Sequence, residues 1–136
     1  MKRMKILTCT LAALAMVMST YIPARAEFFG TFQSNQPWIL QLANASNRGE
    51  IAATVSYLAG KKLEFEALPL VPAATTSTFE MKPIPKNVTR IIIEVDLPAN
   101  NLVADEGFID VTQGAHEFGS LMDSRSGNRF VLEVAP

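Results

Sequence analysis

The 136-residue chain contains one histidine, His116, and the residues needed to make it catalytic are missing. A nucleophilic triad holds a serine or cysteine against the histidine. No G-x-S-x-G motif occurs here, and the only cysteine, Cys9, lies in the apolar N-terminal segment. Zinc requires several His or Cys ligands, which one histidine cannot supply. We therefore expect a non-catalytic chain in which His116 is an exposed or half-buried strand residue.

Side chains that carry oxygen cluster after residue 98. They are Asn100, Asn101, Asp105, Glu106 and Asp110. Such hard ligands on a loop suit calcium, but their spacing does not match an EF-hand. We interpret the cluster as a solvated polar loop, with a calcium-stiffened structural domain as the alternative. A further alternative is a small hydrolase or inhibitor-like module in which the last three of these residues converge with His116. No cofactor is indicated.

Two pairs of acidic residues are spaced two positions apart, Glu64 with Glu66 and Glu94 with Asp96. On a strand, such residues lie about 6.5–7 Å apart on one face. That distance is near the one between the paired carboxylates of glycoside hydrolases. A water-facing strand surface gives the same pattern, so we interpret both pairs as solvated.

The first 26 residues have the three parts of a secretory signal peptide. Three cations, Lys2, Arg3 and Lys5, precede an apolar segment over 6–22, and Ala24 and Ala26 then supply small residues for cleavage. We predict a helical signal peptide over 1–26, cleaved after Ala26, and export to the bacterial periplasm or the medium. A single membrane anchor is the alternative, although the segment is short for a span of about 20 residues.

The predicted mature chain, 27–136, is acidic and contains no cysteine. It carries 8 Lys and Arg against 13 Asp and Glu, a net charge of −5. This balance argues against nucleic acid and anionic membrane surfaces as partners, because both select clustered basic residues. We expect no membrane insertion after cleavage, and a fold that depends on its core without disulfides.

Beyond residue 26, apolar and polar residues alternate in short runs. In 90–96, Ile91, Ile93 and Val95 share one face, while Arg90 and Glu94 share the other. This period of two predicts strands with one face to water. The other runs predict these inward sets: Trp38, Leu40 and Leu42; Ile51, Ala53, Val55 and Tyr57; Leu63, Phe65 and Ala67; Phe79 and Met81; Phe130, Leu132 and Val134.

Turn residues separate about eight or nine such strands, which predicts an all-β fold over 27–136. We expect a single antiparallel β-sandwich, Ig-like or fibronectin-III-like, with a jelly roll as the alternative. The segment "WILQLANASNRGEIAATVSYLAG" reads as a strand, an Asn-rich turn and a second strand. In this outline the chain resembles small exported bacterial Ig-like accessory domains. That resemblance implies no site residues.

The hexapeptide "EFFGTF" near the predicted mature end contains Phe28, Phe29 and Phe32. It is read either as a first strand or as an exposed arm that adds to a partner's sheet edge. These phenylalanines are our candidate partner-binding residues. The resulting hypothesis is an exported, non-catalytic β-sandwich that binds another protein, an envelope component or a second copy of itself.

Overall fold

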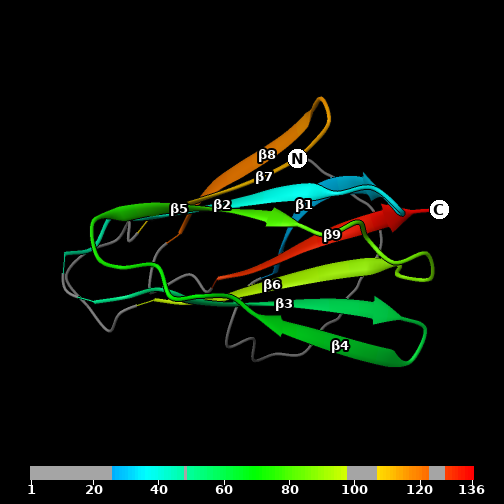
Figure 1. Cartoon of the computed structure of the whole chain (residues 1–136), viewed down its shortest axis with the longest axis horizontal. Helices are drawn as coiled ribbons and strands as arrows, with labels where there is room; N and C mark the ends of the chain where they lie inside the picture. The colour runs from blue at the N-terminus through cyan, green and yellow to red at the C-terminus, as the bar shows by residue number, and fades with distance from the viewer. Residues whose placement is uncertain (1–25, 48, 98–106, 123–127) are drawn as a thin grey trace, which may run out of the picture.

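The computed structural model describes residues 26–47, 49–97, 107–122 and 128–136. These ranges contain strands and no helix (Figure 1). The strands in order are β1 (Ala26–Gln33), β2 (Trp38–Asn44), β3 (Ala52–Ala59), β4 (Lys62–Ala67), β5 (Thr75–Met81), β6 (Arg90–Asp96), β7 (Gly107–Gln113), β8 (His116–Met122) and β9 (Arg129–Ala135). The all-β prediction is confirmed for the described part of the chain.

The strands form two sheets, as expected for a sandwich. The larger has the order β1-β9-β6-β3-β4, and the smaller has the order β5-β2-β7-β8. One pairing differs from the fully antiparallel prediction, because β1 runs parallel to β9. Alternation within a strand cannot reveal that pairing, which joins strands from opposite ends of the chain. Packing of β1 beside β8 defines what we call the closed side of the sandwich, and β4 and β5 form the open side.

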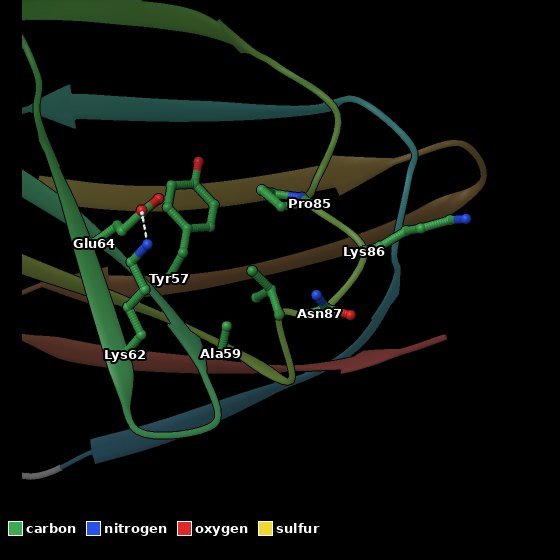
Figure 2. Close-up of a pocket in the computed structure, with 8 residues that line it drawn as sticks. Tyr57, Ala59, Lys62, Glu64, Pro85, Lys86 and Asn87 are labelled. Carbon is green, nitrogen blue, oxygen red and sulfur yellow. Dashed lines mark ion pairs between the residues drawn. The ribbon is translucent and has the colours of Figure 1, made fainter.

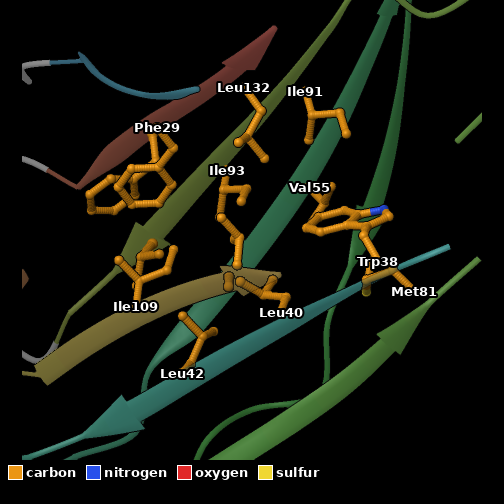
Figure 3. Packing of buried hydrophobic residues seen from close by; sticks show 14 of the residues in the cluster. Phe29, Trp38, Leu40, Leu42, Val55, Met81, Ile91, Ile93, Ile109 and Leu132 are labelled. Carbon is orange, nitrogen blue, oxygen red and sulfur yellow. The ribbon is translucent and has the colours of Figure 1, made fainter. Parts of the chain in front are cut away.

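The core lies between the sheets and follows the alternation of the sequence. In β2, Trp38 and Leu40 are buried, and in β6, Ile91 and Ile93 are completely buried. Figure 3 shows Ile93 and Leu40 pointing toward one another across the space between the sheets. The exposed partners Arg90 and Glu94 face outward. The run of three isoleucines is therefore a one-faced strand in which Ile92 is only half-buried.

Strand β4 is oriented opposite to the prediction. Leu63 and Phe65 were expected to point inward, but they are 42% and 69% exposed. Phe65 pairs with Ser56 and Glu64 pairs with Tyr57, and directly paired residues share a face. The two glutamates of β4 therefore lie on the core-side face of the sheet at its edge, while Leu63 and Phe65 lie on its outer face.

Two buried amide side chains tie loops to the sandwich. Gln113 of β7 accepts a hydrogen bond from the Gln33 backbone N–H (2.7 Å) and donates to the carbonyls of Gln33 (3.0 Å) and Gln36 (3.4 Å). It therefore joins the smaller sheet to the end of β1. Asn44 donates to the carbonyls of Gly49 and Val71 at 2.9 and 3.1 Å. Both amides satisfy backbone groups that strand pairing leaves free.

Candidate functional site

The three N-terminal phenylalanines do not form an exposed arm, because they belong to β1. Phe29 is buried and stacks on Phe130 with ring centroids 4.9 Å apart. Phe32 is completely buried, with its ring centroid 6.0 Å from those of Trp38 and Phe118. Only Phe28 is exposed, at 66%. The arm geometry is therefore wrong, and a binding role stays a prediction for Phe28 alone.

Of the oxygen-rich cluster, only Asp110 lies within the described residues. The predicted ligands Asn100, Asn101, Asp105 and Glu106 lie outside them. Asp110 lies on the outer face of the smaller sheet, in β7, and its Oδ1 is buried without a hydrogen-bond partner among the described residues. Within the described ranges, no three His, Cys, Asp or Glu residues gather as a metal-ligand set. The calcium alternative therefore gains no support from Asp110.

The environment of Asp110 favours its protonated form. Burial is the largest effect that raises the pKa of Asp110 from 3.8 to about 6. The nearby Glu117 carboxyl raises this pKa further, while the Val111 backbone opposes the increase. Two carboxyl groups that share a proton behave in this way. The outer face of β7 and β8 therefore holds two neighbouring carboxyl groups, and the fold favours the protonated, neutral form of Asp110.

Asp110 and His116 do not converge. His116 pairs with the buried Gln113 and therefore shares the core-side face of the β7–β8 hairpin, whereas Asp110 is on the opposite face. His116 itself is exposed at the start of β8, and its ring stacks on Phe118 at 6.5 Å. Of the four residues proposed for a hydrolase site, these two are described, and they cannot act on one substrate atom.

A shallow pocket of about 230 Å³ opens at one end of the sandwich, beside the β3–β4 hairpin (Figure 2). Its lining residues are Tyr57, Ala59, Lys62, Glu64, Pro85, Lys86, Asn87 and Val88. Lys62 and Glu64, both on β4, form an exposed ion pair at 3.2 Å on one side of the pocket. The volume is below the roughly 300–1,000 Å³ of typical small-molecule sites. The pocket therefore fits one inserted side chain better than a substrate.

Tyr57 supplies a neutral hydroxyl to this pocket. Burial is the main cause that raises its pKa from 10.0 to about 12, and the Glu66 carboxylate adds to the effect. The indole N–H of Trp38 acts in the opposite direction, although Trp38 Nε1 meets no partner with full hydrogen-bond geometry among the described residues. At neutral pH the phenol stays protonated, so it can donate or accept a hydrogen bond but cannot act as a base.

Four apolar residues and one serine form a row across the five strands of the larger sheet, on its outer face, and we call it the apolar row. Register places Phe65, Ser56, Ile92, Val131 and Phe28 side by side in that order. Ser56 and Val131 are buried, so Phe65, Ile92 and Phe28 make the accessible part of the row. The outer face of a single solvated sheet is normally polar. The exposed positions of this row are therefore apolar on a face that is normally polar.

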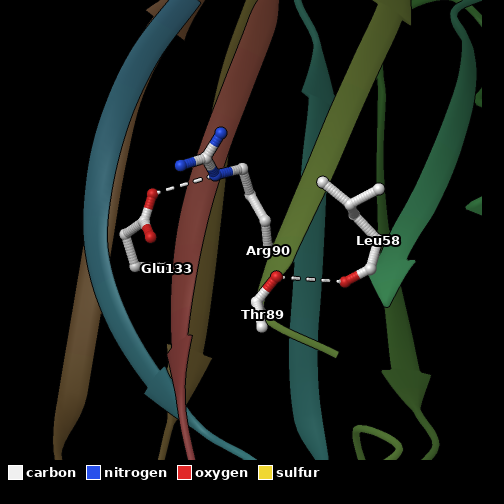
Figure 4. Close-up of polar contacts among 4 residues, drawn as sticks. All are labelled: Leu58, Thr89, Arg90 and Glu133. Atoms are coloured by element: carbon white, nitrogen blue, oxygen red, sulfur yellow. Dashed lines mark hydrogen bonds and ion pairs between the residues drawn. The ribbon is translucent and has the colours of Figure 1, made fainter. Parts of the chain in front are cut away.

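Two ion pairs between β6 and β9 lie on either side of this row. Figure 4 shows the Arg90 guanidinium beside Glu133, with Arg90 Nε 3.0 Å from the carboxylate. On the other flank, Arg129 Nε is 3.8 Å from Glu94. Both pairs are partly exposed and directly opposite in register. The ion pairs lie on β6 and β9, whereas the two most exposed apolar side chains, Phe65 and Phe28, lie at the ends of the row on β4 and β1.

The orientation of β4 could have been recognised from its turn. Gly60 has a φ of +63° and begins a two-residue connection, so Ala59 pairs with Lys62. Counting back from this pair places Glu64 opposite Tyr57, on the face that Tyr57 and Val55 share. The turn length fixes register more strongly than alternation within an exposed strand does. By contrast, no local signal places Gln113 against Gln33.

Within the described residues, no helix has the length and hydropathy of a membrane span. Comparison of the chain with models of known families, with curated proteins and with solved structures finds no match in any of the three. The site is therefore interpreted from its own geometry.

Proposed function

We propose that this chain is an exported, non-catalytic β-sandwich that binds a protein partner through the outer face of its larger sheet. The observation that carries the proposal is the apolar row from Phe65 to Phe28. It spans four strand spacings, or about 19 Å, and both of its ends are highly exposed phenylalanines. Aromatic side chains on an exposed patch are typical anchors of protein interfaces.

An Ig-like type is the finer form of this proposal. The neighbours β9-β6-β3-β4 follow the G-F-C-C′ order of a variable-type immunoglobulin sheet, and β5-β2 follows E-B. In this assignment the β7–β8 hairpin is an addition between F and G, and β7 takes the place beside β2 that strand A has in such domains. Ig-like sandwiches carry many unrelated binding functions, so the fold supports a binding role without specifying the partner.

Export is part of the proposal and comes from the N-terminal sequence. Cleavage after Ala26 would leave β1 from Glu27 onward, with Phe28 and Phe32 still paired to Val131 and Val134. The partner would then be a protein of the envelope or the medium. The predicted charge of −5 and the two exposed phenylalanines suit an apolar contact with a neutral or basic protein surface.

Photocrosslinking in the producing cells tests the proposal. A photoreactive amino acid at Phe65 should give one discrete adduct with an envelope protein, and the same residue at Phe28 should give the same adduct. Matched positions at Thr76 and Glu80, exposed on β5 of the smaller sheet, should give none. An adduct of the chain with itself would identify a homodimer instead. Absence of any adduct from both Phe65 and Phe28 would end the proposal.

A further inference from the structure

All six residues of β4 are exposed, and β4 ends the larger sheet. Among the described strands only β3 pairs with β4, so the other edge of β4 has no described strand beside it. A sheet edge with unpaired backbone groups can accept another strand. The remaining question is what kind of strand this edge accepts, and the register and side chains of β4 answer it.

The register of the β3–β4 hairpin shows which backbone groups are available. In a two-residue hairpin the pair that closes the turn is hydrogen-bonded, and hydrogen-bonded pairs then alternate with open ones. Ala59–Lys62, Tyr57–Glu64 and Val55–Glu66 are thus the bonded pairs. The bond from Leu68 N to Ala53 O (3.0 Å) continues this alternation. The N–H and C=O groups of Leu63, Phe65 and Ala67 therefore point away from β3.

The side chains of β4 define the chemistry of the strand that fits. On the core-side face, Lys62, Glu64 and Glu66 stand in a row, and on the outer face Leu63 and Phe65 do so. Charges of this kind discourage pairing with the wrong strand. Two symmetric antiparallel registers of two copies overlap most of β4. One sets Glu64 against Glu66 twice, and the other sets Glu64 against Glu64 while pairing Lys62 with Glu66. A strand with basic residues opposite both Glu64 and Glu66 avoids the like charges of either register.

We propose that the β4 edge binds an extended segment of the partner by strand addition, with basic residues facing Glu64 and Glu66 and apolar residues facing Leu63 and Phe65. An acidic residue would face Lys62. This inference rests on the proposed binding function and adds which residue types the partner segment carries. The basic side chain opposite Glu64 also reaches the pocket, where the Tyr57 hydroxyl can accept a hydrogen bond from it.

A designed peptide tests the edge directly. Antiparallel to residues 67 to 62, the matching hexapeptide is TKVKVE, with its lysines opposite Glu66 and Glu64. Titrated into the purified, isotope-labelled protein, it should slow amide exchange at Leu63, Phe65 and Ala67. The amides of Glu64 and Glu66, already bonded to β3, should not change. The charge-reversed peptide TEVEVK should bind at least about tenfold more weakly, since like charges then face each other.

Variants of the protein provide the reciprocal test. Glu64→Lys with Glu66→Lys should reverse the preference, so that TEVEVK binds better than TKVKVE by about the same factor. Glu50→Lys with Glu80→Lys changes net charge equally at exposed positions outside β4 and should leave the preference unchanged. A preference that follows net charge in both variants would overturn the proposal.

Backbone methylation separates strand addition from simple charge attraction. The two valines of TKVKVE lie opposite Leu63 and Phe65, so N-methylation of the valines removes donors that face β4 and should abolish binding. N-methylation of the lysines leaves those donors in place and should be tolerated. Binding that survives methylated valines overturns the proposal, as does dimerisation of the protein through β4 in place of peptide binding. If photocrosslinking still finds an envelope partner in that case, the binding function stands and only the edge is excluded.

Discussion

The closed side of the sandwich is held by buried contacts, whereas the open side is exposed to solvent. On the closed side, Phe32 and Phe118 pack with ring centroids 6.0 Å apart, and the Phe118 ring lies directly over Gly30. Gln113 adds two hydrogen bonds to Gln33 of the larger sheet and one to Gln36 in the β1–β2 connection. On the open side, β4 is entirely exposed and its ion pair, Lys62–Glu64, is solvated.

This difference separates stability from recognition. Burial of apolar side chains supplies most of the favourable free energy of folding, and leaving a buried amide unsatisfied is costly. The closed side has both apolar burial and a satisfied amide. Exposed ion pairs contribute little, typically 0–1 kcal/mol, so β4 adds little to stability. Strands with low local stability are the ones that can take new partners. Substitutions matched across the two sides should therefore give contrasting results.

The largest effect is expected at Gly30. Its φ is +134°, a conformation that L side chains rarely adopt, and an added Cβ would fall within contact distance of the Phe118 ring, inside van der Waals separation. Gly30→Ala should lower the free energy of unfolding by about 3 kcal/mol, since backbone strain and a displaced Phe118 add together. Chemical denaturation measures this change.

Gly60 provides the matched control on the open side. Its φ is +63°, and an added Cβ meets nothing within 4 Å. Gly60→Ala should cost only about 1 kcal/mol, from the left-handed conformation alone. Replacing Phe118 by alanine should also reduce the cost of Gly30→Ala. Equal costs at the two glycines would show that the contact with Phe118 does not matter.

The second effect is at Gln113. Gln113→Leu keeps the bulk of the side chain but leaves the Gln33 N–H and two backbone carbonyls without their partner. We expect a loss of about 2 kcal/mol in unfolding free energy. Gln41→Leu removes one exposed bond, from Nε2 to Thr78 Oγ1 at 3.3 Å, and should change stability by less than about 0.5 kcal/mol. Similar losses would contradict the role of Gln113.

The third effect is an increase in the free energy of unfolding, expected when Asp110 beside Glu117 is replaced. Because the folded pKa of Asp110 is raised from 3.8 to about 6, folding favours the protonated carboxyl. Its contribution to stability is complete below pH 3.8 and is lost as pH rises through about 6. Asp110→Asn should therefore stabilise the protein at pH 7, by up to about 1 kcal/mol after screening by water.

Melting at several pH values checks this prediction. The stabilising effect of Asp110→Asn should fade on acidification and be absent below pH 3.8. Glu117→Gln should act in the same direction, and the double variant should gain less than the two gains added, because each removes the same repulsion. A gain that does not depend on pH would exclude the shared-proton interpretation.

Sequence reasoning recovered the elements and much of the core, because both follow from local pattern. The inward sets of β2 and β6 were predicted residue by residue. It failed where position depends on a neighbour far away or on register. Phe29 and Phe32 are buried because β1 pairs with β9, and the orientation of β4 follows from its turn. The surface row formed by Phe65, Ile92 and Phe28 exists only after four strand pairings are assembled.

The smallest effect is expected at Phe65, where the comparison is most direct. Phe65→Thr replaces an exposed side chain with a residue of high strand propensity, so stability should change by less than about 0.5 kcal/mol. Phe118→Thr on the closed side removes a ring that packs against Phe32 and should cost about 2 kcal/mol. Thermal unfolding of both variants measures stability, and photocrosslinking at Phe28 measures partner binding. Phe65→Thr should keep the fold and lose the adduct. A large destabilisation by Phe65→Thr would show that the open side supports the fold and that its apolar surface needs no partner to explain it.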